Sequence, residues 1–298
     1  MAAQYNKWIS KGEKMEYKNM AKEIEEYFKG EQWTRFMEVL NKKEEEIYHI
    51  HIYVDTCLNP WCLEQILKNY FARIGHPVER KIEIFTSGQI AGSGTIHGVE
   101  PRGLTHFDML FRYCDDAVIK PTPDRTENVE YWGEKYMEWF LSRYDFKTVL
   151  TPQEEQEVEA YFESPAWEDY CRLNESEKVV HIHANVETSV HPLVIRDYAL
   201  KAMKKRGWEI EFSAPVAFAM RGQMHGKVVF GGLKPEKMFD IAWSFNPTVT
   251  LIPSTKYWLT TENPTYDART MNEIPVMMQK YDWKMLTLAD MEDAVKFL

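Results

Sequence analysis

Alternating polar and apolar residues predict a β-strand early in the chain. Residues 48–55 read YHIHIYVD. Successive side chains of a strand point to opposite faces, so one face carries His49, His51, Tyr53 and Asp55, and the other carries the aliphatic residues between them. We therefore expect helices to cover the aliphatic face, and we expect the polar face to be open to a cavity or a partner.

A second stretch of the chain divides between two faces in the same way. Residues 180–187 read VHIHANVE. This pattern places four polar residues on one face of a second predicted strand, namely His181, His183, Asn185 and Glu187. Two histidines separated by one residue, with an acidic residue four positions after the second histidine, therefore occur twice.

Helical periodicity follows each of these strands. Apolar residues spaced at i, i+3 and i+4 predict amphipathic helices over 60–75 and 193–207. Segments rich in β-branched and aromatic residues predict further strands, and we expect a second helix in each half, over 105–114 and 234–244. The resulting order of strand, helix, strand, strand, helix and strand is that of a ferredoxin-like βαββαβ unit.

The two halves of the chain match each other in register. His49 is matched by His181 and Pro60 by Pro192, in each case 132 residues further on. The sequence YDFK, which precedes the second half, recurs as YDWK shortly before the C-terminus. Matches in a nearly constant register indicate an internal duplication of roughly 130 residues.

The duplication sets the predicted domain organisation and fold class. We expect a lead segment over 1–24, a first α+β repeat over 25–150 and a second α+β repeat over 151–298. The predicted fold is therefore α+β, with two tandem ferredoxin-like repeats. Each repeat begins with a leading helix, and a pseudo-twofold axis relates the two.

A third histidine is expected beside each histidine pair. The first and third strands of a ferredoxin-like sheet are neighbours, so His97 in TIHG should lie beside the first pair and His225 in QMHG beside the second. Three imidazoles, or two with a carboxylate, form a facial ligand set for a divalent metal. The predicted metal ligands are His49, His51, His97, His181, His183 and His225, and the predicted carboxylate or substrate contacts are Asp55, Glu187, Tyr53 and Asn185.

Composition and charge narrow the range of partners. The net charge of -10 disfavours nucleic acid, whose phosphates require a basic surface. The apolar runs are shorter than a membrane span, and the N-terminal residues lack a signal-like apolar segment. We therefore expect a cytoplasmic protein with a small-molecule ligand, and the sequence is compatible with an oligomer. The four cysteines form no CxxC pair, so we expect reduced, buried thiols that bind no metal.

The histidine pattern resembles that of the DOPA 4,5-dioxygenase-like proteins. The shared features are the HxH strand YHIHIY, a helix, a strand, a histidine next to a glycine, and a strand that ends in proline. The resemblance implies a ferredoxin-like fold and an Fe(II)-dependent dioxygenase acting on a catechol or a similar small aromatic substrate. It also implies that His49 with His51, and equally His181 with His183, occupy the family's HxH positions.

Two other functions would use the same residues. A two-histidine phosphoesterase would employ His51 and His183 as general acid and base on a phosphodiester, and these two are the predicted catalytic residues. A non-enzymatic module would instead use duplicated pockets to bind a ligand or a protein. Lys120 and Ile252 stand where the dioxygenase-like family has a further histidine, and this loss favours a binding module over a working dioxygenase.

Overall fold

A computed structural model describes most of the chain. The described residues are 17–42, 47–83, 92–99, 105–125, 128–210, 227–234, 237–254, 265–270 and 273–298. Contacts divide the chain into a first compact unit, formed by Met1–Lys42, Ile50–Glu130 and Ile274–Leu298, and a second, formed by Lys43–His49 and Tyr131–Glu273. The division passes through β1 (Ile47–Thr56), a continuous strand that we describe with the first unit. This division groups residues by their contacts and does not test where the sequence repeats begin and end. The repeat boundaries therefore stay a prediction from the sequence.

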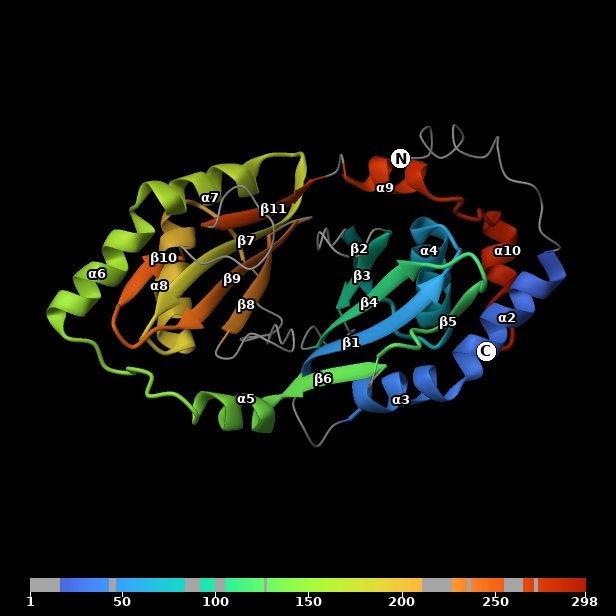
Figure 1. Ribbon diagram of the computed structural model, residues 1–298, viewed down its shortest axis with the longest axis horizontal. Helices are drawn as coiled ribbons and strands as arrows, with labels where there is room; N and C mark the ends of the chain where they lie inside the picture. Colours follow the sequence, from blue (N-terminus) through green and yellow to red (C-terminus); the bar gives the residue numbers. More distant parts are fainter. Residues whose placement is uncertain are drawn as a thin grey trace. The chain divides into compact units, whose positions relative to one another are not determined.

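The first unit contains one β-sheet with helices packed beside it (Figure 1). Within the described residues its sheet has the order β2-β3-β4-β1-β5, and β6 also pairs with β1. Its strands are β1 (Ile47–Thr56), β2 (Glu79–Glu83), β3 (Ser93–Val99), β4 (His106–Tyr113), β5 (Ile119–Pro121) and β6 (Val129–Gly133). Its helices are α2 (Tyr17–Lys29), α3 (Glu31–Leu40), α4 (Pro60–Arg73), α9 (Glu273–Lys280) and α10 (Leu288–Asp293).

The second unit has its own sheet. Within the described residues the strand order is β10-β7-β9-β8, and β11 also pairs with β7. The strands are β7 (Val179–Thr188), β8 (Lys227–Lys234), β9 (Lys237–Phe245), β10 (Leu251–Pro253) and β11 (Tyr266–Thr270). The helices are α5 (Glu134–Leu141), α6 (Pro152–Phe162), α7 (Pro165–Glu175) and α8 (Pro192–Lys205). The predicted mixed α+β class with two sheets is therefore confirmed.

The second helix predicted in each half is wrong. Residues 106–113 form β4 and residues 237–245 form β9. In β4 the buried residues Phe107, Met109 and Phe111 recur at every second position, which is the period of a strand. A short apolar run fits either element, so periodicity alone could not decide. Because β4 lies between β3 and β1, the ferredoxin-like topology is not confirmed, and β3 is not the neighbour of β1.

The covered face of β1 is the aliphatic one, as predicted. Ile50, Ile52 and Val54 are fully buried. On β4, the neighbouring strand, Phe107 packs against Phe36 of α3 and Phe71 of α4, with ring centroids 5.5 and 5.4 Å away. These helices therefore close the apolar side of the first sheet, and the histidines of β1 lie on the opposite side.

Strand β7 of the second unit also leads into a capped helix. Pro192 is the first residue of α8, and the Nδ1 atom of His191 accepts a hydrogen bond from the N–H of Leu193 at 3.2 Å. Burial lowers the pKa of His191, which keeps the ring neutral and Nδ1 available as an acceptor. His191 therefore caps the N-terminus of α8.

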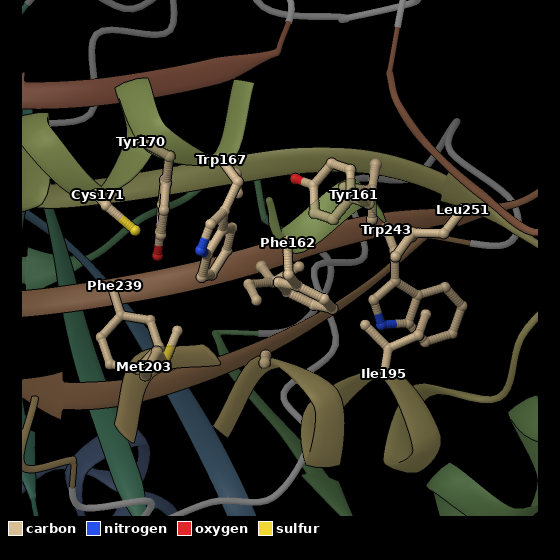
Figure 2. Close-up of a cluster of buried hydrophobic side chains, with 14 of the residues drawn as sticks. Tyr161, Phe162, Trp167, Tyr170, Cys171, Ile195, Met203, Phe239, Trp243 and Leu251 are labelled. Carbon is tan, nitrogen blue, oxygen red and sulfur yellow. The ribbon is translucent and has the colours of Figure 1, made fainter. Parts of the chain in front are cut away.

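Aromatic side chains fill the core of the second unit (Figure 2). Trp167 and Tyr170 of α7 stack with ring centroids 5.0 Å apart. Phe239 and Trp243 of β9 are fully buried in the same cluster, as is Ile195 of α8. Helices α7 and α8 thus contribute to the same buried cluster as β9.

The C-terminal segment completes the first unit. Lys284, in the YDWK sequence, forms a parallel bridge with Leu58, and its N–H donates to the carbonyl of Cys57 at 2.8 Å. Lys147, in the YDFK sequence, forms the same kind of bridge with Val190 in the second unit. After Lys284 the chain continues into α10, which packs against α2 and α4. Met291, Ala294 and Val295 of this segment therefore belong to the core of the first unit.

We expect Met291→Ala to destabilise the first unit by about 2 to 5 kcal/mol, because it removes a fully buried side chain of α10 and leaves a cavity. Urea unfolding measures the loss of free energy of unfolding, and hydrogen exchange of peptides from α2 and α4 shows whether these helices lose protection. Leu288→Ala on the same helix is the control, since Leu288 is 63% exposed. Equal effects of the two substitutions would contradict the packing of α10.

Candidate metal centre

Two neighbouring strands bring three ligand-type side chains together in the first sheet. His49 and His51 alternate on β1, and Asp108 lies on β4. The ligand atoms of these three residues all lie within 4.8 Å of one another. In a facial set, ligand atoms that each lie about 2.1 Å from the ion are about 3 Å apart, so the side chains would have to rotate toward one another to bind one ion. This group could hold a metal ion.

Asp108 interacts with two imidazoles at once. Its Oδ2 atom lies 3.3 Å from Nε2 of His51, and its Oδ1 atom lies 2.7 Å from Nδ1 of His97. His97 stands directly opposite Asp108 in the pairing of β3 with β4, and both residues are buried. An ionised carboxylate only accepts hydrogen bonds, so Nδ1 of His97 carries the proton. His97 thereby fixes the orientation of the carboxylate.

Tyr53 connects the other nitrogen of His51 to a second carboxylate. Its hydroxyl donates to Oε2 of Glu130 at 3.0 Å and lies 3.2 Å from Nδ1 of His51. Because the hydroxyl hydrogen points to Glu130, the Tyr53 oxygen accepts from His51, and Nδ1 of His51 carries a hydrogen. Burial raises the pKa of Tyr53 well above its usual value, which keeps the phenol protonated and able to donate.

These hydrogen bonds place two lone pairs opposite each other. With a hydrogen on Nδ1, a neutral His51 presents a lone pair at Nε2, and Nε2 faces the Oδ2 oxygen of Asp108. A lone pair and a carboxylate oxygen repel unless a cation lies between them. The cation is either a proton on His51 or a metal ion bound by both residues.

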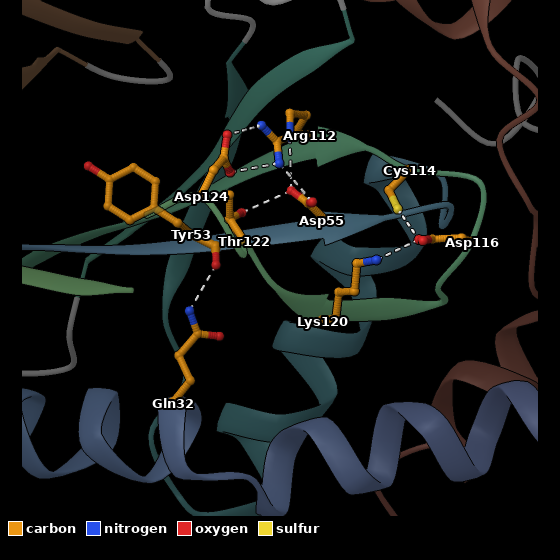
Figure 3. Close-up of polar contacts among 9 residues, drawn as sticks. All are labelled: Gln32, Tyr53, Asp55, Arg112, Cys114, Asp116, Lys120, Thr122 and Asp124. Atoms are coloured by element: carbon orange, nitrogen blue, oxygen red, sulfur yellow. Dashed lines mark hydrogen bonds and ion pairs between the residues drawn. The ribbon is translucent and has the colours of Figure 1, made fainter. Parts of the chain in front are cut away.

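Asp55 has other partners (Figure 3). Arg112 donates to Asp55 from Nε at 3.0 Å and from Nη2 at 2.8 Å, and Thr122 donates to it at 2.9 Å. Arg112 also binds Asp124. The structure thus gives Asp55 a place in an ion-pair network, and Asp108 supplies the carboxylate of the candidate metal centre.

Glu187 occupies the matching position in the second unit and is also hydrogen-bonded. Asn246 donates to its Oε2 atom at 2.8 Å, and the Ser254 hydroxyl lies 3.4 Å from its Oε1 atom. The other predicted residues of this unit are described only in part. His183 is half-buried and Asn185 is buried, but the side chain of His181 and the whole of His225 lie outside the described residues.

The Asp108 ligand was missed from the sequence, although a signal was present. Phe107-Asp108 recurs as Phe239-Asp240, again 132 residues further on. The pairing of β8 with β9 places Gly231 opposite Asp240, the position that His97 takes opposite Asp108. The sequence pattern matched His225 with His97, but the strand register places Gly231 at the position that corresponds to His97.

A cavity of about 610 Å³ lies elsewhere in the first unit. It is lined by α2, α3 and the segment around β5, with Gln32, Glu23 and Lys120 among its residues, and it contains neither His51 nor Asp108. The candidate metal centre is separate from this cavity. Its side chains are partly accessible, with His51 at 18% and Asp108 at 10% exposed.

The cysteine side chains and the lengths of the helices bear on two further predictions from the sequence. The four cysteines are free, and Cys57, Cys62 and Cys171 are buried. Burial raises the pKa of Cys62 to about 12, which keeps this thiol protonated.

Among the described helices, none is both long and apolar enough to cross a membrane.

Comparison with known proteins gives no relative. No family model, no curated protein and no solved structure matches this chain. The resemblance to the DOPA 4,5-dioxygenase-like proteins therefore stays a prediction, and the function must be argued from the side chains.

We expect Arg112→Met to lower the free energy of unfolding by about 2 to 3 kcal/mol, because it leaves the buried Asp55 carboxylate without its cation. Urea denaturation measures the loss. Arg172→Met is the matched control: Arg172 pairs with Asp169 at the surface, and its loss should change the stability by about 0.5 kcal/mol or less. A similar loss in both variants would contradict a structural role for the Asp55 network.

Proposed function

We propose that the first unit binds one divalent metal ion through His49, His51 and Asp108, and that the protein is a metal-dependent enzyme. Two histidines and one carboxylate that leave one side of the ion open are the ligand set of non-haem Fe(II) oxygenases. The observation that carries the proposal is the placement of His51 Nε2 and Asp108 Oδ2 3.3 Å apart, with the hydrogen of His51 directed to Tyr53. A proton on His51 or a metal ion bound by both residues would relieve this repulsion, and the half-buried His49 offers a third ligand atom within 4.8 Å.

We further propose Fe(II) as the metal and a catechol or a similar small aromatic compound as the substrate. The metal, when bound, would supply the electrophilic activation of the substrate oxygens and of dioxygen. Ring opening breaks one carbon–carbon bond and places both oxygen atoms of dioxygen in the product, so no other reductant is needed. The histidine pattern shared with the dioxygenase-like proteins supports the substrate class.

The residues around the centre would position its ligands. His97 holds Oδ1 of Asp108, which would leave Oδ2 to bind the ion. Tyr53, itself bound to Glu130, holds Nδ1 of His51, which would leave Nε2 to bind the ion. Partners of this kind fix the orientation and the tautomer of metal ligands and raise metal affinity.

The alternatives from the sequence remain distinguishable by experiment. A two-histidine phosphoesterase would act without metal, with His51 as one of its acid–base groups. A binding module would catalyse neither oxygenation nor phosphodiester hydrolysis. The carboxylate of Asp108 favours the metal site, because it gives the set a negative charge that offsets part of the charge of a divalent cation.

The metal content of purified protein tests the site. The chain is loaded anaerobically with Fe(II), freed of excess metal and submitted to elemental analysis. We expect Asp108→Asn and the double variant His49→Ala/His51→Ala to lose one equivalent of iron that the wild type retains. Asp55→Asn is the control, and it should retain that equivalent because Asp55 is bound to Arg112.

Dioxygen uptake tests the reaction. With catechol or 3,4-dihydroxyphenylalanine as the probe, the loaded wild type should consume dioxygen and form a coloured ring-opened product, and Asp108→Asn should not. Equal iron content in the wild type and in Asp108→Asn would overturn the metal site. Iron binding without turnover of either probe would refute the proposed substrate class. Metal-independent hydrolysis of a phosphodiester would favour the phosphoesterase.

His97 is expected to act as a positioning residue. We expect His97→Leu to weaken metal binding about 10- to 100-fold, since it frees the carboxylate of Asp108 to turn. His97→Asn should recover part of the affinity, because its amide nitrogen stands close to the position of Nδ1. Metal titration gives the dissociation constants. His76→Leu, at an exposed position, is the control, and an equal loss in His97→Leu and His97→Asn would contradict the role.

A further inference from the structure

Strand β7 carries its histidines at the same positions as β1. Both strands are ten residues long, and β7 (Val179–Thr188) begins and ends 132 residues after β1 (Ile47–Thr56). The helices that follow, α4 and α8, are also related by 132 residues at both ends. His181 and His183 therefore stand on one face of the second sheet, as His49 and His51 do on the first.

Strand β9 places an aspartate beside this histidine pair. It runs parallel to β7 in the sheet, and Asp240 is the register partner of His183. Figure 1 shows β7 between β9 and β11. Asp240 also stands 132 residues after Asp108, the carboxylate of the first centre. The second sheet thus repeats the juxtaposition of two histidines and one aspartate across neighbouring strands.

Strand β11 places a second aspartate on the other side of β7. Asp267 is the register partner of His183, and Arg269 is the partner of His181. Directly opposite residues of paired strands share a face of the sheet. His183 therefore stands between Asp240 and Asp267 in one row across three strands. The row has two acidic positions and one imidazole position, which suits a divalent cation.

The buried amide of Asn185 is an independent indication that a ligand binds to this face of the sheet. It follows His183 by two residues on β7 and so shares its face, and it is only 2% exposed. Neither its Nδ2 nor its Oδ1 atom has a hydrogen-bond partner among the residues that the structure describes. Buried amide groups are rarely left unsatisfied, because desolvation without a partner costs free energy. A bound ion with its water would satisfy this amide.

We infer that the second unit holds a second divalent metal site, formed by His181, His183 and Asp240 and completed by the amide of Asn185. Asp267 is a further acidic position in the same row. The side chains of His181, Asp240 and Asp267 lie outside the described residues, and strand register alone places these residues. The ligands of this site are all distinct from those of the first centre, so the inference does not depend on the proposed function. It replaces His225 with Asp240 as the third ligand.

The second site should bind metal more weakly than the first. Gly231 stands where the first sheet has His97, and Asn185 stands where it has Tyr53. The two positions that hold positioning side chains in the first sheet are therefore a glycine and an asparagine in the second. Loss of such partners lowers metal affinity by about 10- to 100-fold, which predicts two classes of site in one chain.

Titration with Co(II) tests the inference, because its visible absorption reports the ligands and its binding can be counted. We expect wild-type protein to bind two equivalents, the second about 10- to 100-fold more weakly. Asp240→Asn and, independently, His183→Gln should each lose the weaker equivalent and keep the tighter one. Asp108→Asn should show the reverse, and Asp108→Asn/Asp240→Asn should bind none. Asp197→Asn, at an exposed position, is the control.

Each pattern of loss has one meaning for folded protein, as checked by circular dichroism. Two equivalents, with the weaker one lost in either second-unit variant, support the second site. A single equivalent that is lost in Asp108→Asn and kept in Asp240→Asn and His183→Gln overturns it and leaves the first centre intact. A single equivalent lost only in the second-unit variants supports the second site and overturns the first. No binding by wild type overturns both.

Discussion

The alternation of side chains along β1 is the constraint on which the candidate metal centre depends. Ile50, Ile52 and Val54 are fully buried, and burial of each such side chain stabilises the fold by about 1.5 to 3 kcal/mol. A shift of one residue in the pairing of β1 would expose all three and turn His49 and His51 into the core. The apolar face therefore fixes the register, and the register fixes the histidines. No interaction of the histidines themselves is needed to place them.

Asp108 adds a mostly buried carboxylate to the two histidines of β1. A carboxylate that is mostly removed from water needs hydrogen-bond donors or cations to offset its desolvation. His97 satisfies one of its oxygens with an N–H group. The other oxygen faces His51, whose own hydrogen is directed to Tyr53. The chain of contacts from Glu130 to His97 thus brings Oδ2 of Asp108 opposite Nε2 of His51, beside His49, where a proton or a metal ion would be stabilised.

The sequence predicted the histidine positions better than their surroundings, and strand geometry explains why. The histidines and the aliphatic residues of β1 lie on one strand, so a period of two assigns their faces. Asp108 meets His51 only across the sheet, and such a contact depends on which strands are neighbours. The residues around Asp108 formed a short apolar run that a helix explains equally well. The predicted contact of β3 with β1 failed for the same reason.

The choice between the two acidic residues near the histidines shows the same limit. Asp55 is close to His51 in sequence, but four residues along a strand separate them by about 13 Å. A residue on the neighbouring strand can lie within about 5 Å. Sequence proximity therefore pointed to Asp55, although the sheet brings Asp108 to the histidines and gives Asp55 to Arg112.

The two units satisfy the acidic residue at the end of the histidine strand in different ways, and the difference bears on charge. Asp55 is paired with the guanidinium of Arg112, so its charge is balanced. Among the described residues, the hydrogen-bond donors to Glu187 are the neutral Asn246 and Ser254. Within that part of the chain, Glu187 therefore has neutral donors where Asp55 has a guanidinium. Glu187 lies four residues along β7 from His183, about 13 Å, where solvent and salt screen much of its field. Its charge therefore adds little to the affinity of that sheet for a cation, which depends on the residues that lie opposite His183.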